Sequence, residues 1–188
     1  MVEKLGAYAV GFIFYKKSKR YIFPESASEI IQALSPLTFK VGVFVNEDPE
    51  KINKTASIIK LNTVQLHGDE TPGIAELIDL HVIKSFRING ELDYNLLKGY
   101  KNVSYLFDSF SPKDYGGTGK KFNWHLIPKE LNGNFILSGG ISIKNIEEVM
   151  KSVKPKAIDV TSSLERSPGI KDHKKVKEFF TKINSIRS

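Results

Sequence analysis

Cysteine is missing from this chain, and long apolar runs are scarce. None of the 188 residues is cysteine, which excludes a disulfide framework, a thiolate metal site and a cysteine nucleophile within them. No apolar stretch approaches the ~18 residues that a membrane span requires, so the pattern excludes an integral membrane protein. The first residues, Met1 to Gly6, contain no apolar core of the kind found in a secretory signal. We therefore expect a cytoplasmic protein with no membrane partner.

Acidic residues are fewer than basic ones. The chain has 21 Asp and Glu against 28 Lys and Arg, a formal net charge of +7. The basic residues are mostly lysines scattered between acids, and only residues 16–20 and 171–175 are dense in them. No recognised nucleic-acid motif accompanies these segments, so we expect no nucleic-acid partner. A positive field does raise the local concentration of a small anionic substrate.

Apolar runs of strand length alternate with helical patterns along the chain. Most runs are nearly continuous rather than alternating, as in parallel strands covered on both faces. Helix starts are marked at Pro24, Pro49, Pro72 and Ser142, and a last helix is expected over residues 172–186. The expected strands are Ala7–Phe14, Phe39–Val45, Thr63–His67, Val82–Phe86, Tyr105–Asp108, Phe135–Ser138 and Ala157–Val160. Repeated βα units of this kind predict an α/β fold with a parallel sheet.

These strands number one fewer than the eight of a closed (β/α)8 TIM barrel. The chain starts with Val2–Leu5, which resembles the end of a helix, and Gly6 stands at its C-cap position. A helix end without a preceding strand predicts one TIM-barrel domain over residues 1–188, with the first strand and most of the first helix absent. The alternative is an open seven-stranded sheet. In the first case the two terminal strands, Ala7–Phe14 and Ala157–Val160, expose apolar edges.

A carboxylate closes one of the predicted strands. Asp108 follows Ser104–Phe107, and the glycine-rich segment Tyr115–Lys120 comes soon after it. In parallel α/β proteins the carboxyl ends of strands carry the chemistry, and a glycine-rich loop can close over a ligand because glycine permits close backbone approach. Asp108 is therefore a candidate catalytic residue. The alternative is an aspartate that only caps the next turn.

Small residues follow the last two predicted strands. The first of these strands ends in Ser138-Gly139-Gly140, and the next is followed by Thr161-Ser162-Ser163. Small residues leave backbone N–H groups free to point at an anion, and in TIM barrels the last two strand ends commonly hold a phosphate. A phosphate site at these two strand ends is the prediction.

Three polar residues near other strand ends are candidates for substrate binding. Arg20 lies in the loop after the first strand, where a guanidinium can grip a carboxylate, although a solvated surface arginine is the alternative. Gln65 and His67 alternate along one strand and so point to the same side. We interpret them as hydrogen-bonding walls of a pocket rather than catalysts. The sequence shows no metal-ligand spacing, dinucleotide fingerprint or Walker loop.

Taken in order, the motifs of this chain resemble those of phosphoribosylanthranilate isomerase. The matching segments are Gly11–Phe14 with Ser18–Tyr21, Val41–Asn46, Val64–Gly68, Phe107–Asp108 with Tyr115–Gly119, Leu137–Gly140 and Asp159–Glu165. The resemblance implies a TIM barrel of tryptophan biosynthesis that works without a cofactor or a metal. Its reaction converts N-(5-phosphoribosyl)anthranilate to 1-(2-carboxyphenylamino)-1-deoxyribulose 5-phosphate by an Amadori rearrangement. A small phosphoribosyl substrate and a monomer or homodimer are expected.

The resemblance also implies roles for individual residues. Asp108 would be the general acid that protonates the ribose ring oxygen and opens the ring to a Schiff base. Arg20 would hold the anthranilate carboxylate, and Asp159 would lie near the anthranilate amine. The residues implied to bind phosphate are Gly139, Gly140, Ser162 and Ser163.

Two departures from the family stand out. The family's general base is a cysteine in a Lys-Ile-Cys-Gly-like motif of the first strand, and the 188 residues contain neither. Ser163 stands where the family commonly has glycine, which would strain the backbone if its φ were positive. General base catalysis is worth ~10²–10⁴-fold, so we expect little activity from these residues alone.

Three hypotheses follow. The chain is an isomerase sequence shortened at its N-terminus, or a catalytically silent phosphosugar-binding barrel protein. The third is an isomerase of a histidine-pathway aminoaldose, which the segments Ser18–Tyr21 and Gln65–Gly68 disfavour.

Overall fold

The computed structural model describes residues 1–90, 94–109 and 123–187, and these form two compact units. Unit 1 comprises residues 1–85 and 96–104, and unit 2 comprises residues 86–95 and 105–188. Seven strands follow one another in the sheet in chain order, β1 to β7. The division between the units passes through β4 (His81–Ile88), α4 (Tyr94–Lys98) and β5 (Val103–Ser109).

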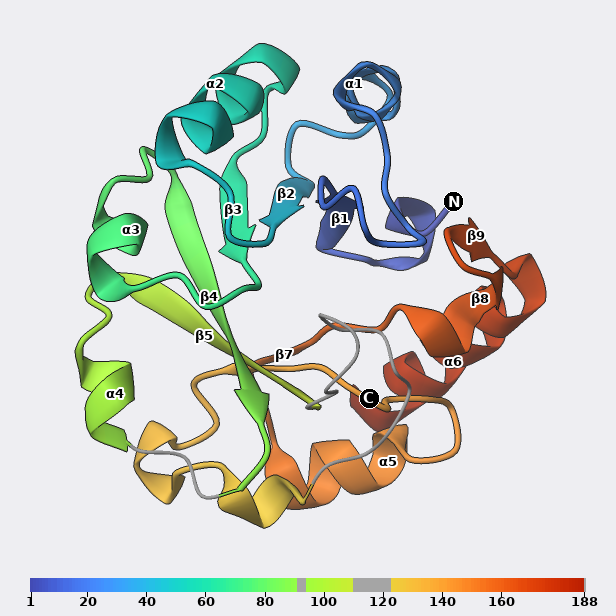
Figure 1. The fold of residues 1–188 in the computed structure, drawn as a ribbon. Helices are drawn as coiled ribbons and strands as arrows, with labels where there is room; N and C mark the ends of the chain where they lie inside the picture. The colour runs from blue at the N-terminus through green and yellow to red at the C-terminus, as the bar shows by residue number, and fades with distance from the viewer. Residues whose placement is uncertain (91–93, 110–122, 188) are drawn as a thin grey trace. The chain divides into compact units, whose positions relative to one another are not determined.

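Unit 1 is built of parallel strands joined by helices. Strand β1 pairs with β2, β2 with β3 and β3 with β4, all in parallel. Figure 1 shows these strands in sequence, with α1 and α2 next to each other. The other elements of unit 1 are η1 (Glu3–Leu5), β1 (Ala9–Ile13), α1 (Pro24–Gln32), β2 (Phe39–Phe44), α2 (Pro49–Ile59), β3 (Thr63–Leu66) and α3 (Pro72–Glu76).

Unit 2 continues the pattern with shorter strands. Strand β5 pairs in parallel with β6, and β6 with β7, while β8 and β9 form a separate antiparallel hairpin. The elements of unit 2 are η2 (Trp124–Leu126), η3 (Lys129–Leu131), β6 (Ile136–Leu137), α5 (Ile146–Glu148), the π-helical turn η4 (Val149–Val153), β7 (Ala157–Ile158), η5 (Ser162–Leu164), β8 (Glu165–Ser167), β9 (Ile170–Lys171) and α6 (His173–Arg187).

Helix starts follow the local sequence signals. Helices α1, α2 and α3 each begin with a proline, whose fixed φ suits the first helical position. Asp48 caps α2, because its Oδ1 accepts hydrogen bonds from the backbone N–H groups of Glu50 and Lys51. Gly6 ends η1 with φ +101°. These boundaries confirm the predicted helix starts at Pro24, Pro49 and Pro72 and the predicted C-cap. The start predicted at Ser142 was wrong, because α5 begins at Ile146 after a turn over the preceding residues.

Each unit has its own apolar core. Side chains that are fully buried in unit 1 include Ile52, Val64 and Leu66, and those in unit 2 include Phe107 and Val176. In unit 2 the rings of Phe107 and Phe135 meet edge to face, with centroids 5.3 Å apart. Burial of this kind on both strand and helix residues is what the continuous apolar runs predicted.

All seven predicted strands are present, with different ends in places. Strands β6 and β7 are only two residues long, whereas four residues were predicted for each. Beyond β6 the backbone turns at Gly139 (φ +79°) and Gly140 (φ +65°), which takes the chain out of the sheet. The β8–β9 hairpin and α4 were not predicted. In the part of the chain that the structure describes, no helix is long and apolar enough to cross a bilayer.

Candidate functional site

Asp108 lies near the end of β5 and is buried, with 2% of its surface exposed. Its Oδ1 accepts hydrogen bonds from the backbone N–H of Ser109 at 2.7 Å and from Ser109 Oγ at 3.4 Å. A Cβ added to Gly139 would stand 2.6 Å from the same oxygen. Asp108 therefore lies directly against the loop that follows β6, and only glycine leaves room for its carboxylate. The glycine-rich segment Tyr115–Lys120 lies outside the described residues.

The loop after β6 is held in shape by a buried amide. Asn145, 5% exposed, donates from Nδ2 to the carbonyl oxygen of Gly140 at 2.8 Å. Its Oδ1 accepts from the backbone N–H of Ser142 at 2.8 Å and from Ser142 Oγ at 3.4 Å. One neutral side chain thus satisfies polar groups at both ends of the turn and fixes the path of Gly139–Gly140 without adding a charge.

The loop after β7 is bonded to the loop after β6. Ser163 Oγ donates to the carbonyl oxygen of Ile141 at 2.7 Å, so the two small-residue segments lie side by side. Behind them, Lys171 Nζ donates to the carbonyl oxygen of Thr161 at 3.1 Å. The backbone N–H groups of Gly140, Ser162 and Ser163 donate to no backbone carbonyl oxygen among the described residues. Such a group of N–H donors is suited to an anion.

Ser163 does not carry the strain that a glycine position would have implied. The described residues other than glycine with positive φ are Asn46, Lys60, Asn102, Asn132 and Lys154. Since Ser163 is not among them, a serine there needs no left-handed backbone, and its hydroxyl supplies the bond between the two loops.

Asp159 follows β7 directly and is half-buried. Its backbone N–H donates to the carbonyl oxygen of Leu137 at 2.8 Å, which continues the β6–β7 pairing by one bond. Its Oδ2 accepts a hydrogen bond from Ser138 Oγ at 3.3 Å. In unit 2 the structure therefore brings together Asp108, Asp159 and the two small-residue loops at the carboxyl ends of β5, β6 and β7.

Gln65 and His67 belong to unit 1 and are both buried, with 6% of each exposed. Gln65 Nε2 lies 2.8 Å from His67 Nδ1, which confirms that the two side chains point the same way. An amide nitrogen can only donate, so Nδ1 accepts and the neutral ring carries its hydrogen on Nε2. His67 therefore has its hydrogen-bond donor at Nε2, in agreement with a hydrogen-bonding rather than a catalytic role.

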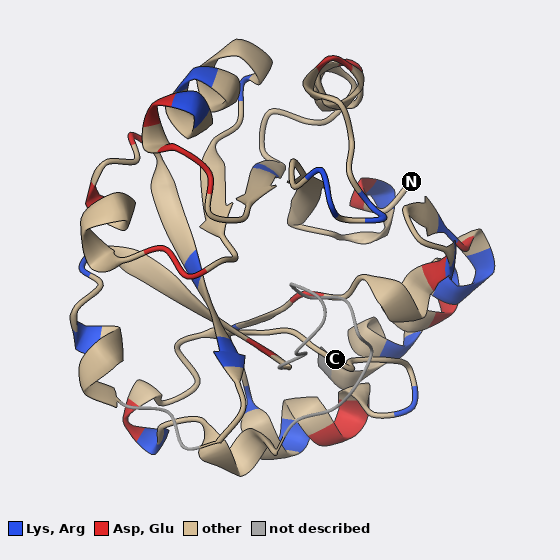
Figure 2. Ribbon diagram, in the orientation of Figure 1, with Lys and Arg blue, Asp and Glu red and all other residues tan. Residues whose placement is uncertain are grey.

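Arg20 lies in the loop after β1, also in unit 1, and is half-buried. Its backbone N–H donates to Ser18 Oγ at 3.1 Å, and Tyr21 forms a bridge with Ile13 that brings the loop back along β1. Figure 2 shows the basic residues of this loop, and a second basic group around β9 and the start of α6.

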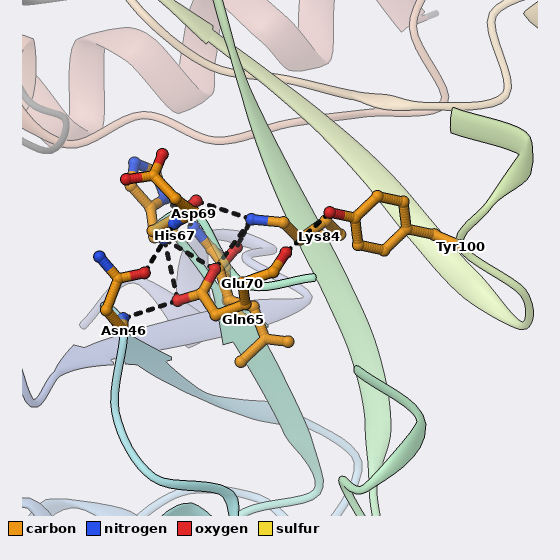
Figure 3. Close-up of polar contacts among 9 residues, drawn as sticks. Asn46, Gln65, His67, Asp69, Glu70, Lys84 and Tyr100 are labelled. Carbon is orange, nitrogen blue, oxygen red and sulfur yellow. Dashed lines mark hydrogen bonds and ion pairs between the residues drawn. The ribbon is translucent and has the colours of Figure 1, made fainter. Parts of the chain in front are cut away.

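A buried ion pair between the middle of β4 and the loop after β3 was not predicted. Lys84 Nζ lies 2.8 Å from Glu70 Oε2, and the two side chains are 3% and 2% exposed. Figure 3 shows Lys84 reaching from β4 toward Glu70 beside His67. A signal was present in the sequence, because a lysine inside the apolar run Val82–Phe86 requires a buried counter-ion.

The carboxylate of Glu70 connects two loops. Its Oε1 accepts from the backbone N–H of Asn46 at 2.8 Å and of Gly68 at 3.0 Å. The hydroxyl of Tyr100 donates to the Glu70 carbonyl oxygen at 2.7 Å. Burial raises the pKa of Tyr100, and the negative charges of Glu70 and Asp69 raise it further, so this hydroxyl keeps its hydrogen at neutral pH.

Metal ligation is not indicated by the described residues. Across residues 1–90, 94–109 and 123–187, no group of three or more His, Asp or Glu side chains could hold a metal ion. The strand ends carry the buried carboxylates of Asp108 and Glu70 and the imidazole of His67.

Comparison with known proteins gives one consistent result. A sequence profile of the family described as N-(5'phosphoribosyl)anthranilate (PRA) isomerase matches residues 1–182. A curated relative from Trichlorobacter lovleyi, named N-(5'-phosphoribosyl)anthranilate isomerase, is 44% identical over 176 residues, which are 93% of this chain and 86% of the relative.

Solved structures agree with the sequence relatives. The phosphoribosyl anthranilate isomerase of Thermus thermophilus superposes with a TM-score of 0.90 at 34% identity, covering 99% of this chain and 92% of its own. A second structure has a TM-score of 0.85 at 40% identity and covers 98% and 91% of the two chains. It is described as phosphoribosyl anthranilate isomerase in complex with reduced 1-(o-carboxyphenylamino)-1-deoxyribulose 5-phosphate.

Proposed function

The chain belongs to the N-(5'-phosphoribosyl)anthranilate isomerase family, and from this membership we propose how its residues divide the reaction. Its fold class is the (β/α)8 TIM barrel, of which this chain contains seven strands. Its function is that of an isomerase of tryptophan biosynthesis. The substrate is N-(5-phosphoribosyl)anthranilate, and the product is 1-(2-carboxyphenylamino)-1-deoxyribulose 5-phosphate.

Asp108 is the general acid of this proposal. Its protonated carboxyl gives a proton to the ribose ring oxygen while the bond from that oxygen to C1 breaks. The nitrogen lone pair then forms the C=N bond of a Schiff base. Ser109 supports the role, because its N–H donates to Oδ1 at 2.7 Å and fixes the direction of the carboxyl group.

The next step requires a base. Loss of the C2 proton from the protonated Schiff base gives an enolamine. This takes up a proton at C1 and loses the proton of its C2 hydroxyl group, which gives the amino-ketose product. The family's base is a cysteine, and the 188 residues contain none. General base catalysis contributes ~10²–10⁴-fold, so these residues by themselves should turn over slowly.

The phosphate is bound by the two loops of unit 2. The observation that carries this assignment is the bond from Ser163 Oγ to the Ile141 carbonyl oxygen at 2.7 Å, which joins the two segments. Their N–H groups then converge on one anion. The residues proposed to bind phosphate are Gly139, Gly140, Ser162 and Ser163, and Asp159 is proposed to lie near the anthranilate amine.

Three residues of unit 1 are also proposed to bind the substrate. The guanidinium of Arg20 grips the anthranilate carboxylate with paired hydrogen bonds, while Gln65 and His67 form a neutral hydrogen-bonding wall. A single domain over residues 1–188, a cytoplasmic location and a monomer or homodimer remain predictions, as does the absence of a nucleic-acid partner.

A structure with a bound ligand tests the phosphate assignment. Soaking with inorganic phosphate, or with the reduced product analogue, should place the phosphate against Gly139–Gly140 and Ser162–Ser163. A phosphate bound instead near Lys16–Lys19, away from both late strand ends, would refute the assignment.

A turnover measurement tests the catalytic part. The 188-residue chain should isomerise the substrate slowly. Joining a strand with the Lys-Ile-Cys-Gly motif, its loop and most of a helix before Met1 should raise turnover by ~10²-fold or more. If the joined protein binds the product analogue but remains inactive, the alternative of a silent phosphosugar-binding protein is favoured. Rapid turnover by the 188 residues alone would mean that a residue other than cysteine takes the proton.

A further inference from the structure

Lys84 and Glu70 form a buried ion pair whose presence is not explained by stability alone. It lies at the carboxyl end of β3, where Lys84 in the middle of β4 pairs with Leu66, next to Gln65 and His67. Both side chains are almost completely buried. A buried ion pair is seldom the most stabilising choice, because well-packed apolar side chains of similar volume often do as well or better. Its retention at a strand end therefore points to a task other than stability.

The ammonium group of Lys84 donates hydrogen bonds to the segment that contains His67. Nζ donates to the carbonyl oxygen of Gly68 at 2.8 Å, to that of Leu66 at 3.4 Å, and to Glu70 Oε2 at 2.8 Å. The two carbonyl groups flank His67 on either side in the chain. Lys84 thus fixes the backbone immediately before and after that ring.

The carboxylate of Glu70 fixes the same segment from the other side. It accepts from the Gly68 backbone N–H through both oxygens at 3.0 Å, and from the Asn46 backbone N–H at 2.8 Å. Asn46 in turn accepts from the Asp69 backbone N–H at 2.7 Å. A Cβ on Gly68 would come within 2.7 Å of Glu70 Oε1, so the loop closes tightly around the carboxylate.

We propose that Lys84 and Glu70 are positioning residues for the isomerase reaction, which hold the His67 ring in one orientation at the carboxyl end of β3. The pair acts through the backbone of Leu66–Gly68, and Gln65 completes the arrangement by bonding to Nδ1. The inference rests on the proposed function for the identity of the ligand. The effect on His67 itself does not depend on that identity.

The test compares two double variants of matched chemistry. Lys84→Met with Glu70→Gln removes both buried charges at nearly constant volume, so that neither charge is left unpaired. The control is Lys151→Met with Glu147→Gln, a lysine–glutamate pair 2.9 Å apart whose side chains are 71% and 46% exposed. Each protein is titrated with the reduced product analogue and, separately, with inorganic phosphate, and its histidine ring nitrogens are observed by ¹⁵N NMR.

The expected result separates the two ligands. The buried double variant should bind the product analogue about tenfold or more weakly, since small misplacement of a contacting group is costly. Its affinity for inorganic phosphate should stay within about twofold of the parent, and its His67 signals should no longer show one tautomer. The control should match the parent in all three measurements. A folded buried variant with unchanged analogue affinity and an unchanged His67 tautomer would overturn the proposal.

Two further outcomes also test the proposal and the identity of the ligand. If the buried variant does not fold, the parent spectrum is used: a single His67 tautomer with hydrogen on Nε2 supports the proposal, and a mixture of tautomers contradicts it. If the parent binds phosphate but not the product analogue, the proposed substrate is wrong. The ¹⁵N comparison between parent and variant then still tests whether Lys84 and Glu70 hold His67.

Discussion

The strand ends of unit 1 and unit 2 are stabilised in opposite ways. In unit 1 a carboxylate of the chain, Glu70, occupies the backbone N–H groups of the loops and is neutralised by Lys84. In unit 2 the loops are joined by neutral groups, the amide of Asn145 and the hydroxyl of Ser163. The first arrangement contains its own anion, whereas the second leaves N–H groups for an external one.

This difference suggests how one chain can hold a side chain in one orientation in unit 1 and bind a phosphate in unit 2. Where a loop must hold a side chain in one orientation, buried charges give strong and directional bonds. Where a loop must accept a phosphate, neutral groups such as the Asn145 amide keep it in shape without adding a negative charge that would repel the ligand. Changing the charges of unit 1 should therefore affect stability most, and changing the loops of unit 2 should affect ligand binding most.

The largest effect is expected from breaking the charge pair on one side only. Lys84→Met leaves Glu70 buried without its counter-ion and should lower the free energy of unfolding by about 3–5 kcal/mol. The measurement is chemical denaturation followed by circular dichroism. Lys84→Met with Glu70→Gln should lose markedly less, and equal losses in the two proteins would show that the unpaired charge is not the cause.

The next effect is on turnover and concerns unit 2. Asp108→Asn keeps the shape of the side chain but removes the transferable proton, so it should lower turnover at least ~10²-fold. The assay uses the chain with the Lys-Ile-Cys-Gly strand joined before Met1. Asp79→Asn, the same change at an exposed aspartate, serves as the control, and near-normal turnover of the Asp108 variant would remove its role as the acid.

Loss of the neutral loop amide should weaken binding more selectively. Asn145→Ala leaves the Gly140 carbonyl oxygen and the Ser142 N–H without their partner and should cost about 1–3 kcal/mol of stability. Phosphate affinity, measured by calorimetry, should fall with it. The matched control is Asn53→Ala in unit 1, whose amide bonds to Leu77 and Asp79 backbone groups. If both variants reduced phosphate affinity equally, the result would contradict the proposal that the unit 2 loop binds the phosphate.

The smallest effect is expected from an exposed charge. Hydrogen bonds from Lys182 and Lys151 lower the pKa of Glu147 from 4.5 to about 2. Because the folded pKa is depressed, Glu147 contributes stability above about pH 4.5, and that contribution is lost as the pH falls toward 2. Solvent screening keeps it small. Melting temperatures of the parent and Glu147→Gln should differ slightly at neutral pH and converge in acid, and a difference that grew in acid would contradict the assignment.

Much of the fold could be predicted because its signals are local. The prolines that open α1, α2 and α3 and the apolar runs of the strands act within a few residues. The predicted lengths of β6 and β7 were wrong. After β6, the turn at Gly139–Gly140 takes the chain out of the sheet, which the composition of the apolar run alone did not show. The pair of Gln65 and His67 was predicted from strand alternation, which is also a local rule.

The amino-acid sequence by itself determined the order of strands and helices, the strand-end position of Asp108 and the small residues of the phosphate loops. It also determined the family, through motifs that keep their order along the chain. Only the tertiary structure decided that Glu70 accepts from Asn46, that Ser163 bonds to Ile141, and that Gly139 lies against Asp108. The physical reason is distance along the chain. Periodicity and capping act over a few neighbouring residues, whereas these contacts join different βα units and exist only once the strands have paired in register.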